Sequence, residues 1–152
     1  RFSELAQQWL SQHPQQNVAL LLFDIDLFKN INDRYGHSAG DAVLKALVSR
    51  LQQLVPPQGW FARLGGEEFA IWLGGASLTE AALLAEQCRL ALCNDPLQWQ
   101  QQQISISASF GVVAGPAPAE LETLLQSADQ LLYQAKTAGR NCCISKPLQR
   151  VE

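Results

Sequence analysis

Apolar positions along the chain follow two different periods, which predict an architecture built from both helices and strands. Helical spacing predicts helices over Phe2–Gln12, Leu27–Tyr35, a segment capped by Asp41 and ending near Leu54, Thr79–Cys93 and Glu120–Ala138. Continuous or alternating apolar runs predict strands over Val18–Asp24, Trp60–Leu64, Phe69–Leu73, Ile104–Phe110 and Cys142–Ser145. Because the two kinds of element are interspersed, we expect an α/β or α+β fold with a mixed sheet covered by helices.

Turn-forming residues separate these segments. Gly65 and Gly66 lie between two short apolar runs and predict a tight hairpin, because such turns need positive φ angles. Four consecutive glutamines, Gln100–Gln103, predict a solvated hairpin edge, and Gly115–Pro118 predicts a loop.

Composition narrows the classes of function. The 152 residues are 47% hydrophobic and 16% charged, which is typical of one packed domain. The net charge of -3 argues against a phosphate-binding stripe for a nucleic acid polymer, although a small nucleotide needs only a few cations. The four cysteines and two histidines lack zinc-site spacing. The longest apolar run, Val18–Phe23, is far shorter than a membrane span, so we expect a cytoplasmic domain without membrane contact.

An Asp-x-Asp motif follows the most apolar strand. Asp24 and Asp26 flank Ile25 immediately after Ala19–Phe23. A buried carboxylate is costly unless it is paired or binds a metal, and the end of a central strand can face a ligand crevice. Mg²⁺ prefers such hard oxygen ligands. The alternative is a pair of carboxylates that cap or stabilise the turn.

The predicted hairpin carries a second acidic pair. Gly65 and Gly66 leave room for a phosphate or a base, and Glu67 and Glu68 lie beside that gap. Neighbouring side chains of a strand point to opposite faces, so we expect only one glutamate to share a site with Asp24. The alternative is a tight turn with solubilising charges.

Further polar residues could bind a nucleotide. Lys136 and Arg140 lie on one face of the last helical turn, where they could bind a triphosphate or simply complement the helix dipole. Lys29 has the same two interpretations, as a phosphate ligand or a solvated lysine. Asn32 and Asp41 could recognise guanine, although local hydrogen bonding and helix capping are the alternatives.

Three separate segments in this order resemble the GGDEF family of diguanylate cyclases. They are Phe23–Asp41, Arg63–Phe69 and Ala128–Asn141, and the loop Gly65-Gly66-Glu67-Glu68-Phe69 is similar to the GGEEF variant of the family signature. The resemblance implies an α+β, palm-like fold with a five-stranded mixed sheet, similar to adenylyl cyclases. It also implies that two GTP molecules condense into cyclic di-GMP and two pyrophosphates in a homodimer, the 3′-hydroxyl of each GTP attacking the α-phosphate of the other.

The resemblance assigns roles to individual residues. Asp24, Glu67 and the carbonyl of Ile25 would bind Mg²⁺, or Mn²⁺ in its place, with two ions per active site; Asp26 would have a supporting role. Glu67, Glu68 and Arg63 would be catalytic. The substrate-binding residues would be Lys29, Asn32, Asp41, Gly65, Gly66, Lys136 and Arg140.

Two departures from the family pattern lead to further expectations. Pro56–Gly59 replaces the Arg-x-x-Asp of the inhibitory product site, so feedback through that site should be missing. The chain begins after the usual Asp-x-Leu-Thr stretch, so residues 1–152 are expected to be the cyclase domain of a longer protein. That protein would carry an upstream sensor or dimerisation domain and could be membrane-anchored there. The alternative function is a catalytically silent, GTP-binding regulatory domain.

Overall fold

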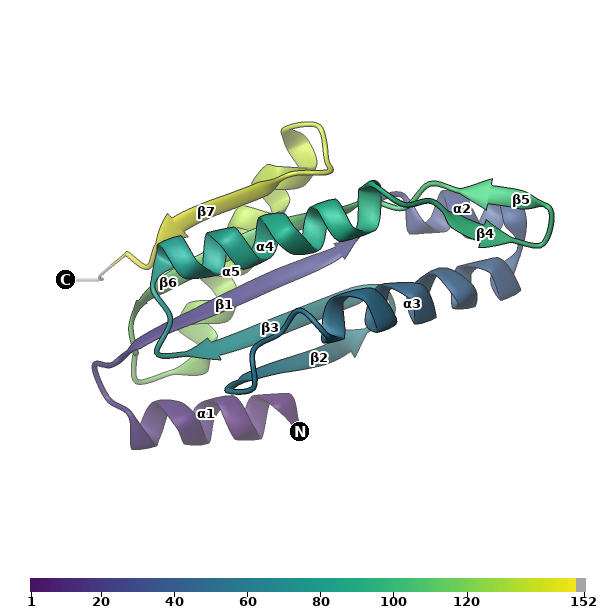
Figure 1. Cartoon of the computed structure of the whole chain (residues 1–152). Coiled ribbons are helices and arrows are strands. Elements are labelled where there is room, and N and C mark those ends of the chain that lie inside the picture. The colour runs from purple at the N-terminus through teal and green to yellow at the C-terminus, as the bar shows by residue number, and fades with distance from the viewer. Residues whose placement is uncertain (150–152) are drawn as a thin grey trace.

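The computed structural model describes residues 1–149, in which helices and strands are interspersed along the chain (Figure 1). The helices are α1 (Phe2–Gln12), α2 (Phe28–Tyr35), α3 (His37–Gln52), α4 (Leu78–Cys93) and α5 (Leu121–Thr137). The strands are β1 (Asn17–Ile25), β2 (Gly59–Gly65), β3 (Glu68–Gly74), β4 (Leu97–Trp99), β5 (Gln102–Ile104), β6 (Ala108–Pro116) and β7 (Cys143–Pro147).

Five strands form one mixed sheet in the order β2-β3-β1-β6-β7. β1 pairs antiparallel with both β3 and β6, whereas β6 and β7 are parallel. β4 and β5 form a separate hairpin beyond the C-terminal end of α4, and β4 packs beside α3 (Figure 1). The predicted five-stranded mixed sheet surrounded by helices is therefore confirmed.

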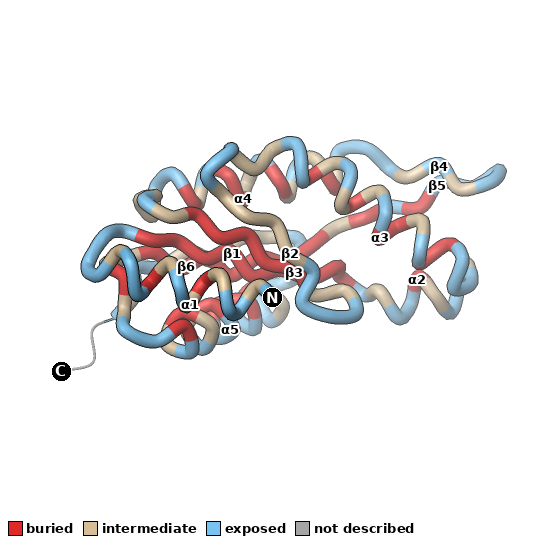
Figure 2. Tube along the Cα trace, turned by 90° about the horizontal axis from the view of Figure 1, so that it is seen from below, coloured by how far each residue is buried: buried red, intermediate tan, exposed pale blue. Residues whose placement is uncertain are grey.

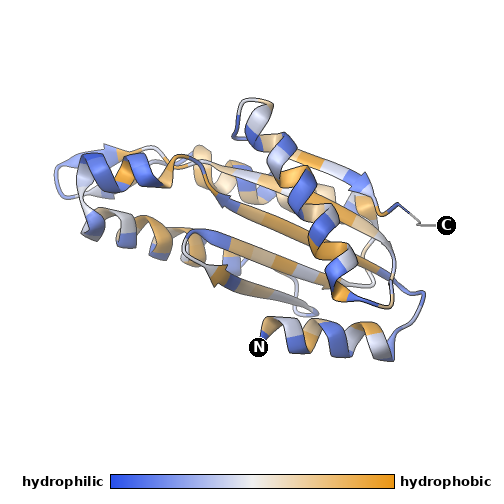
Figure 3. Cartoon of the chain, turned by 180° about the vertical axis from the view of Figure 1, so that it is seen from behind, coloured by the Kyte–Doolittle hydropathy of each residue, from blue (hydrophilic) through white to orange (hydrophobic). Residues whose placement is uncertain are grey.

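Helices cover both faces of the sheet, because alternate residues of β1 face opposite layers. Leu21 and Phe23 pack with α3 and α4, whereas Leu20 and Leu22 pack with α1 and α5. Figure 2 shows the buried strands between these two helical layers, and Figure 3 shows the apolar centre of the sheet with hydrophilic outer faces on the helices. Burial on both faces explains why β1 is a continuous apolar run rather than an alternating one.

Several predicted boundaries are wrong. The predicted strand Ile104–Phe110 is divided, since only residues from Ala108 onward pair with β1, and β6 continues through the predicted loop at Gly115 and Pro116. Asp41 does not cap α3; the helix begins at His37 after Gly36, so Asp41 lies inside it. Ser77 rather than Thr79 caps α4, through a reciprocal capping box with Glu80.

Both predicted hairpins are present. Gln100 lies in the β4–β5 turn with a φ of 53°, and Gly66 has a φ of 52° in the β2–β3 turn. Within residues 1–149, none of the helices combines the length and apolar character needed to span a membrane.

Candidate active site

Asp24 lies near the end of β1, where the strand leaves the core and faces a pocket. Its carboxylate Oδ2 accepts a hydrogen bond from Lys136 Nζ at 2.6 Å, and only 11% of the Asp24 side chain is exposed. Burial raises the pKa of Asp24, and the hydrogen bond and charge of Lys136 oppose this effect. The structure therefore joins the Asp-x-Asp motif to the last helical turn of α5.

The β2–β3 hairpin brings both glutamates to this carboxylate. Glu68 lies opposite Asp24 in the β1–β3 register, and the backbone amide of Ile25 donates to the carbonyl of Glu67 at 3.4 Å. The charges of Glu67 and Asp26 further raise the pKa of Asp24. Burial, followed by the charges of Asp24 and Asp129, raises the pKa of Glu68.

Glu67 lines the pocket with Asp24 and Glu68 does not, which agrees with the expectation that only one glutamate shares a site with Asp24. Strand alternation, the reason given for that expectation, is not the cause. β3 begins at Glu68, so Glu67 belongs to the turn, and the alternation of side chains along a strand does not apply to it. Glu68 faces Asp24 across the strand pair outside this pocket, and the charge of Asp24 contributes to the raised pKa of Glu68. Arg63 stabilises this turn, because its Nε donates to the carbonyl of Gly66 at 2.8 Å.

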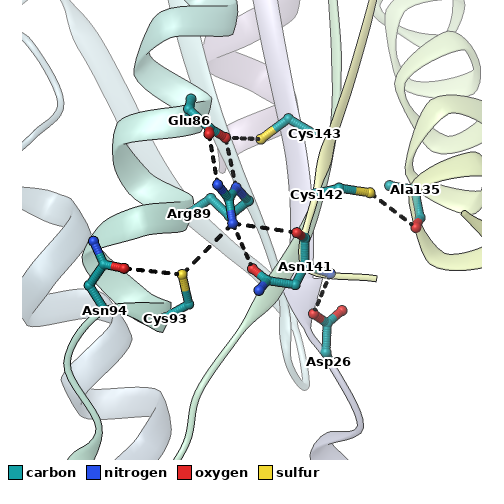
Figure 4. Close-up of polar contacts among 9 residues, drawn as sticks. All are labelled: Asp26, Glu86, Arg89, Cys93, Asn94, Ala135, Asn141, Cys142 and Cys143. Atoms are coloured by element: carbon teal, nitrogen blue, oxygen red, sulfur yellow. Dashed lines mark hydrogen bonds and ion pairs between the residues drawn. The ribbon is translucent and has the colours of Figure 1, made fainter. Parts of the chain in front are cut away.

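Asp26 has a different environment from Asp24. Its two carboxylate oxygens accept hydrogen bonds from the hydroxyls of Ser107 and Ser109, both at 2.6 Å, and from the backbone amide of Asn141 at 2.9 Å (Figure 4 shows the last contact). These three donors link β1 to Ser107 just before β6, to Ser109 within β6, and to the α5–β7 turn. The partners fit the predicted supporting role of Asp26, although nothing in the sequence identified Ser107, Ser109 or Asn141 beyond the alternation of serines over residues 105–109.

Cations surround the acidic cluster. One pocket is lined by Asp24, Ile25, Glu67 and three predicted phosphate ligands, Lys29, Lys136 and Arg140. Lys29 and Arg140 are exposed, so their charged groups are free to reach a ligand. The pocket thus combines acidic groups with nearby cations, an arrangement suited to a metal–nucleotide complex.

The predicted guanine-binding residues lie on α2 and α3, which pack against each other. A β-carbon placed on Gly40 would lie 1.9 Å from Asn32 Oδ1, so the Asn32 side chain rests directly on this glycine. Asp41, the next residue, is exposed. Neither Asn32 nor Asp41 lines the pocket around Asp24, so the two groups of predicted ligands occupy adjoining parts of the surface.

The acidic residues fit a divalent cation in number and chemistry. Two carboxylates, Asp24 and Glu67, converge beside the backbone of Ile25, and Mg²⁺ usually binds through one or two carboxylates plus water and substrate phosphates. Within the described part of the chain, no group of three or more Asp, Glu, His or Cys side chains is arranged to hold a metal by itself. A cation here would therefore complete its coordination with backbone, water and ligand oxygens.

The fold and the sequence both match known proteins. The model of the family described as "Diguanylate cyclase, GGDEF domain" matches residues 2–142. Diguanylate cyclase VdcA of Vibrio cholerae is 42% identical over 132 residues, which cover 85% of this chain and 39% of that protein. The chain spans less than half the length of the curated relatives that it matches.

Solved structures agree with this assignment. The GGDEF domain of DgcB from Caulobacter crescentus, in complex with c-di-GMP, has a TM-score of 0.90 at 26% identity, covering 95% of this chain and 87% of that one. The active GGEEF domain of a diguanylate cyclase from Vibrio cholerae has a TM-score of 0.80 at 32% identity, covering 99% and 92%. The palm-like topology expected from the sequence is therefore confirmed.

Proposed function

The chain belongs to the GGDEF-domain family of diguanylate cyclases, and from this membership we propose that it condenses two GTP molecules into cyclic di-GMP. The observation that carries the proposal is the convergence of Asp24 and Glu67 with Lys29, Lys136 and Arg140 in one pocket at the end of the sheet. Glu68 lies opposite Asp24 on the neighbouring strand. The similar V. cholerae domain, described as active, is a GGEEF domain, and this chain has the same loop at residues 65–69.

In the proposed site, Asp24, Glu67 and the carbonyl of Ile25 hold divalent cations, two Mg²⁺ per site or Mn²⁺ in their place. The bound cations supply positive charge to the phosphoryl oxygens. Lys29, Lys136 and Arg140 bind phosphates, with Lys as a point charge and Arg as a planar fork. Glu68 contributes the second catalytic acid, and Arg63 stabilises developing charge.

Recognition of the base uses the neighbouring helices. Asn32 can both donate and accept hydrogen bonds, and Asp41 accepts from the N1–H and 2-amino groups of guanine. Gly65 and Gly66 let the nucleotide approach the hairpin, since a Cβ at either position would meet no atom within 4 Å. This open space supports binding of the substrate against the turn.

The proposed reaction requires a second copy of the domain. Each half-reaction forms a bond between the 3′-oxygen of one GTP and the α-phosphorus of the other, and breaks the bond between that phosphorus and the departing pyrophosphate. The 3′-hydroxyl gives up its proton to the surrounding water in the same step. One set of Asn32, Asp41 and Arg140 in the chain is sufficient for one nucleotide, so the second GTP comes on a partner. An upstream sensor or dimerisation domain would bring the copies together in the cytoplasm, without feedback at Pro56–Gly59.

The test is product formation by a protein held as a dimer through a fused coiled coil. Incubation with GTP and Mg²⁺ should yield cyclic di-GMP, identified by chromatography and mass spectrometry. Glu67→Gln should abolish the product and keep the folded state. The matched control, Glu122→Gln, changes an exposed acid at the opposite end of α5 from Lys136 and should leave turnover unchanged.

A dimer that makes no cyclic di-GMP would refute the cyclase activity. Binding of GTP by that dimer, measured by calorimetry, would then favour the alternative function, a silent GTP-binding regulatory domain. Full activity of Glu67→Gln would instead refute the role assigned to this carboxylate.

A further inference from the structure

Arg89, on α4, is held in one orientation by a neighbouring acid. Its Nε and Nη2 donate to the two carboxylate oxygens of Glu86, both at 2.7 Å (Figure 4). This bidentate fork restricts the guanidinium more than a single contact would. The Arg89 side chain is 17% exposed, whereas that of Glu86 is 47% exposed, so the guanidinium is mostly covered and its acidic partner is half-exposed.

The free edge of the guanidinium points toward the α5–β7 turn. Arg89 Nη1 donates to the side-chain oxygen of Asn141 at 3.1 Å and lies 3.5 Å from the Asn141 carbonyl oxygen (Figure 4). The same nitrogen lies 3.8 Å from Cys93 Sγ. Two of these three acceptors belong to Asn141, 52 residues further along the chain. Arg89 therefore connects α4 to the α5–β7 turn, which is distant from α4 in the sequence.

This turn has an unfavourable backbone conformation. Gly139, Arg140 and Asn141 have φ angles of 119°, 64° and 47°, which place three consecutive residues on the positive side of φ. Glycine tolerates positive φ and asparagine partly does, but arginine rarely adopts it. The conformation persists only where surrounding contacts impose it.

Asn141 is connected to the candidate active site both by its own backbone amide and by the residue that precedes it. Its backbone amide donates to Asp26 Oδ2, and the preceding residue, Arg140, lines the pocket with Asp24 and Lys136. The Arg140 amide is bonded to the end of α5, to the carbonyl of Ala135 at 3.1 Å. Asn141, which follows Arg140, is fixed to the sheet by its contact with Asp26 and to α4 by its contact with Arg89.

We propose that Arg89 is a positioning residue for the nucleotide site, which holds Asn141 so that the turn presents Arg140 to the phosphates and donates an amide to Asp26. Arg89 itself does not line the pocket around Asp24, so it acts only through these groups. The inference rests on the proposed function for the identity of the nucleotide, GTP. The tether between Arg89 and Asn141 can be tested with or without catalysis.

The experiment compares Arg89→Gln with Arg50→Gln in the dimerised protein. Arg50 is the matched control, because its Nη1 likewise joins its helix to a distant segment, at the carbonyls of Ala91, Leu92 and Asp95, but makes no hydrogen bond to the α5–β7 turn. Amide hydrogen exchange of Asn141 is measured by NMR, and binding of a non-hydrolysable GTP analogue with Mg²⁺ is measured by calorimetry. Both variants are also combined with Arg140→Ala, and thermal unfolding reports global stability.

We expect Arg89→Gln to increase the exchange rate of the Asn141 amide and to weaken nucleotide binding, each by roughly tenfold, the effect of losing one charge-assisted hydrogen bond. Arg50→Gln should change neither. In the Arg140→Ala background, Arg89→Gln should cause little further loss of binding, because the two residues act in series. Unchanged exchange at Asn141, or losses that simply add, would overturn the proposal.

Two further measurements keep the outcomes distinct. If Arg89→Gln does not fold, Asn141→Gly removes the main acceptor of Arg89 while leaving α4 intact and tolerating the positive φ. It should weaken binding in the same direction, and unchanged binding would overturn the proposal. If the wild-type dimer binds nucleotide but makes no cyclic di-GMP, the cyclase assignment fails and the exchange and binding results still decide the role of Arg89. If it binds no nucleotide, both the nucleotide site and the role of Arg89 in positioning it are overturned, and the exchange rate reports only on the contact between Arg89 and Asn141.

Discussion

Lys136 Nζ and Asp24 Oδ2 lie 2.6 Å apart, although the two residues are separated by 112 positions in the sequence. The contact brings a predicted phosphate ligand onto a predicted metal ligand. Burial nevertheless raises the pKa of Asp24, so the single cation does not fully compensate for the loss of solvent and the charges of Glu67 and Asp26. Ionisation of Asp24 consequently costs the folded protein stability.

Replacement of Asp24 by Asn should abolish cyclic di-GMP formation and leave the fold at least as stable as wild type at pH 7. The folded-state pKa of Asp24 lies above its ordinary value of 3.8, so its ionisation disfavours the folded state as pH rises through this interval. The neutral amide removes that penalty. Below pH 3.8 the carboxyl is protonated in both states, and the advantage of the variant should disappear.

Thermal unfolding of both proteins at pH 7 and near pH 3.5 measures this difference. Asp33→Asn, which changes an exposed acid on α2, is the control and should leave the melting temperature within about 2 °C of wild type. A variant that melts well below wild type at pH 7 would show that Asp24 stabilises the fold through Lys136 instead.

Hydrophobic patterning predicted most of the architecture because the sheet is buried on both faces. Residues 18–23 form an unbroken apolar run and become the central strand, and the Leu44, Leu47 and Leu51 stripe packs under the sheet. Hydrophobic patterning did not predict the bounds of β6, because these depend on which residues form hydrogen bonds with β1. Ile104 and Ile106 are both buried and alternate as a strand should, but neither pairs with β1, which begins its ladder with β6 at Ala108.

The charged residues of the candidate site could be selected from the sequence, because carboxylates after an apolar strand and nearby cations indicate metal and phosphate binding. The residues that support them could not. Ser107, Ser109 and Asn141 are ordinary polar residues whose role depends on meeting Asp26. Arg89 lies on an amphipathic helix, where a charged side chain is usually a solvated one. Only the three-dimensional structure shows that its guanidinium reaches the α5–β7 turn.

Gly40→Ala should selectively weaken GTP binding. The added methyl would lie 1.9 Å from Asn32 Oδ1 and 3.2 Å from Phe28 Cζ, so the Asn32 side chain has to move away from the site proposed for guanine. Loss of one such hydrogen bond should raise the KM for GTP by roughly tenfold. Global stability should change by less than about 1 kcal/mol, because alanine favours the helix and offsets part of the clash.

Steady-state kinetics of the dimerised protein check this prediction, with Ser38→Ala as an exposed control on the same helix. The preference for GTP over ATP should fall in Gly40→Ala and stay constant in Ser38→Ala. An unchanged KM together with an unchanged preference would exclude Asn32 from base recognition.

Gly111→Ala should destabilise the whole domain. Gly111 is buried in β6, and a β-carbon there would lie 2.3 Å from the carbonyl oxygen of Ala128 and 2.4 Å from the amide nitrogen of Leu132. Both are backbone atoms of α5, so the helix that carries Lys136 would have to shift as a unit. We expect a loss of about 3 kcal/mol, at the upper end of the usual cost of overpacking.

Urea unfolding monitored by circular dichroism measures this loss. Gly65→Ala is the control for stability, because a β-carbon there meets no atom within 4 Å and its φ is not positive. A Gly111→Ala protein as stable as this control would mean that α5 does not rest directly on β6 at this position.

The thiols of Cys88 and Cys143 should resist alkylation in the folded protein. Burial raises the pKa of each to about 12, and the charge of Glu86 adds to the effect at Cys143. Because the thiolate is the reactive form, iodoacetamide at pH 8 should modify both at least about a hundredfold more slowly in the folded than in the urea-unfolded protein. Mass spectrometry of tryptic peptides over time measures both rates. Arg89→Gln removes the cation that opposes this shift, so Cys143 should become no more reactive in that variant; rapid modification would show instead that the α4–β7 contact has opened.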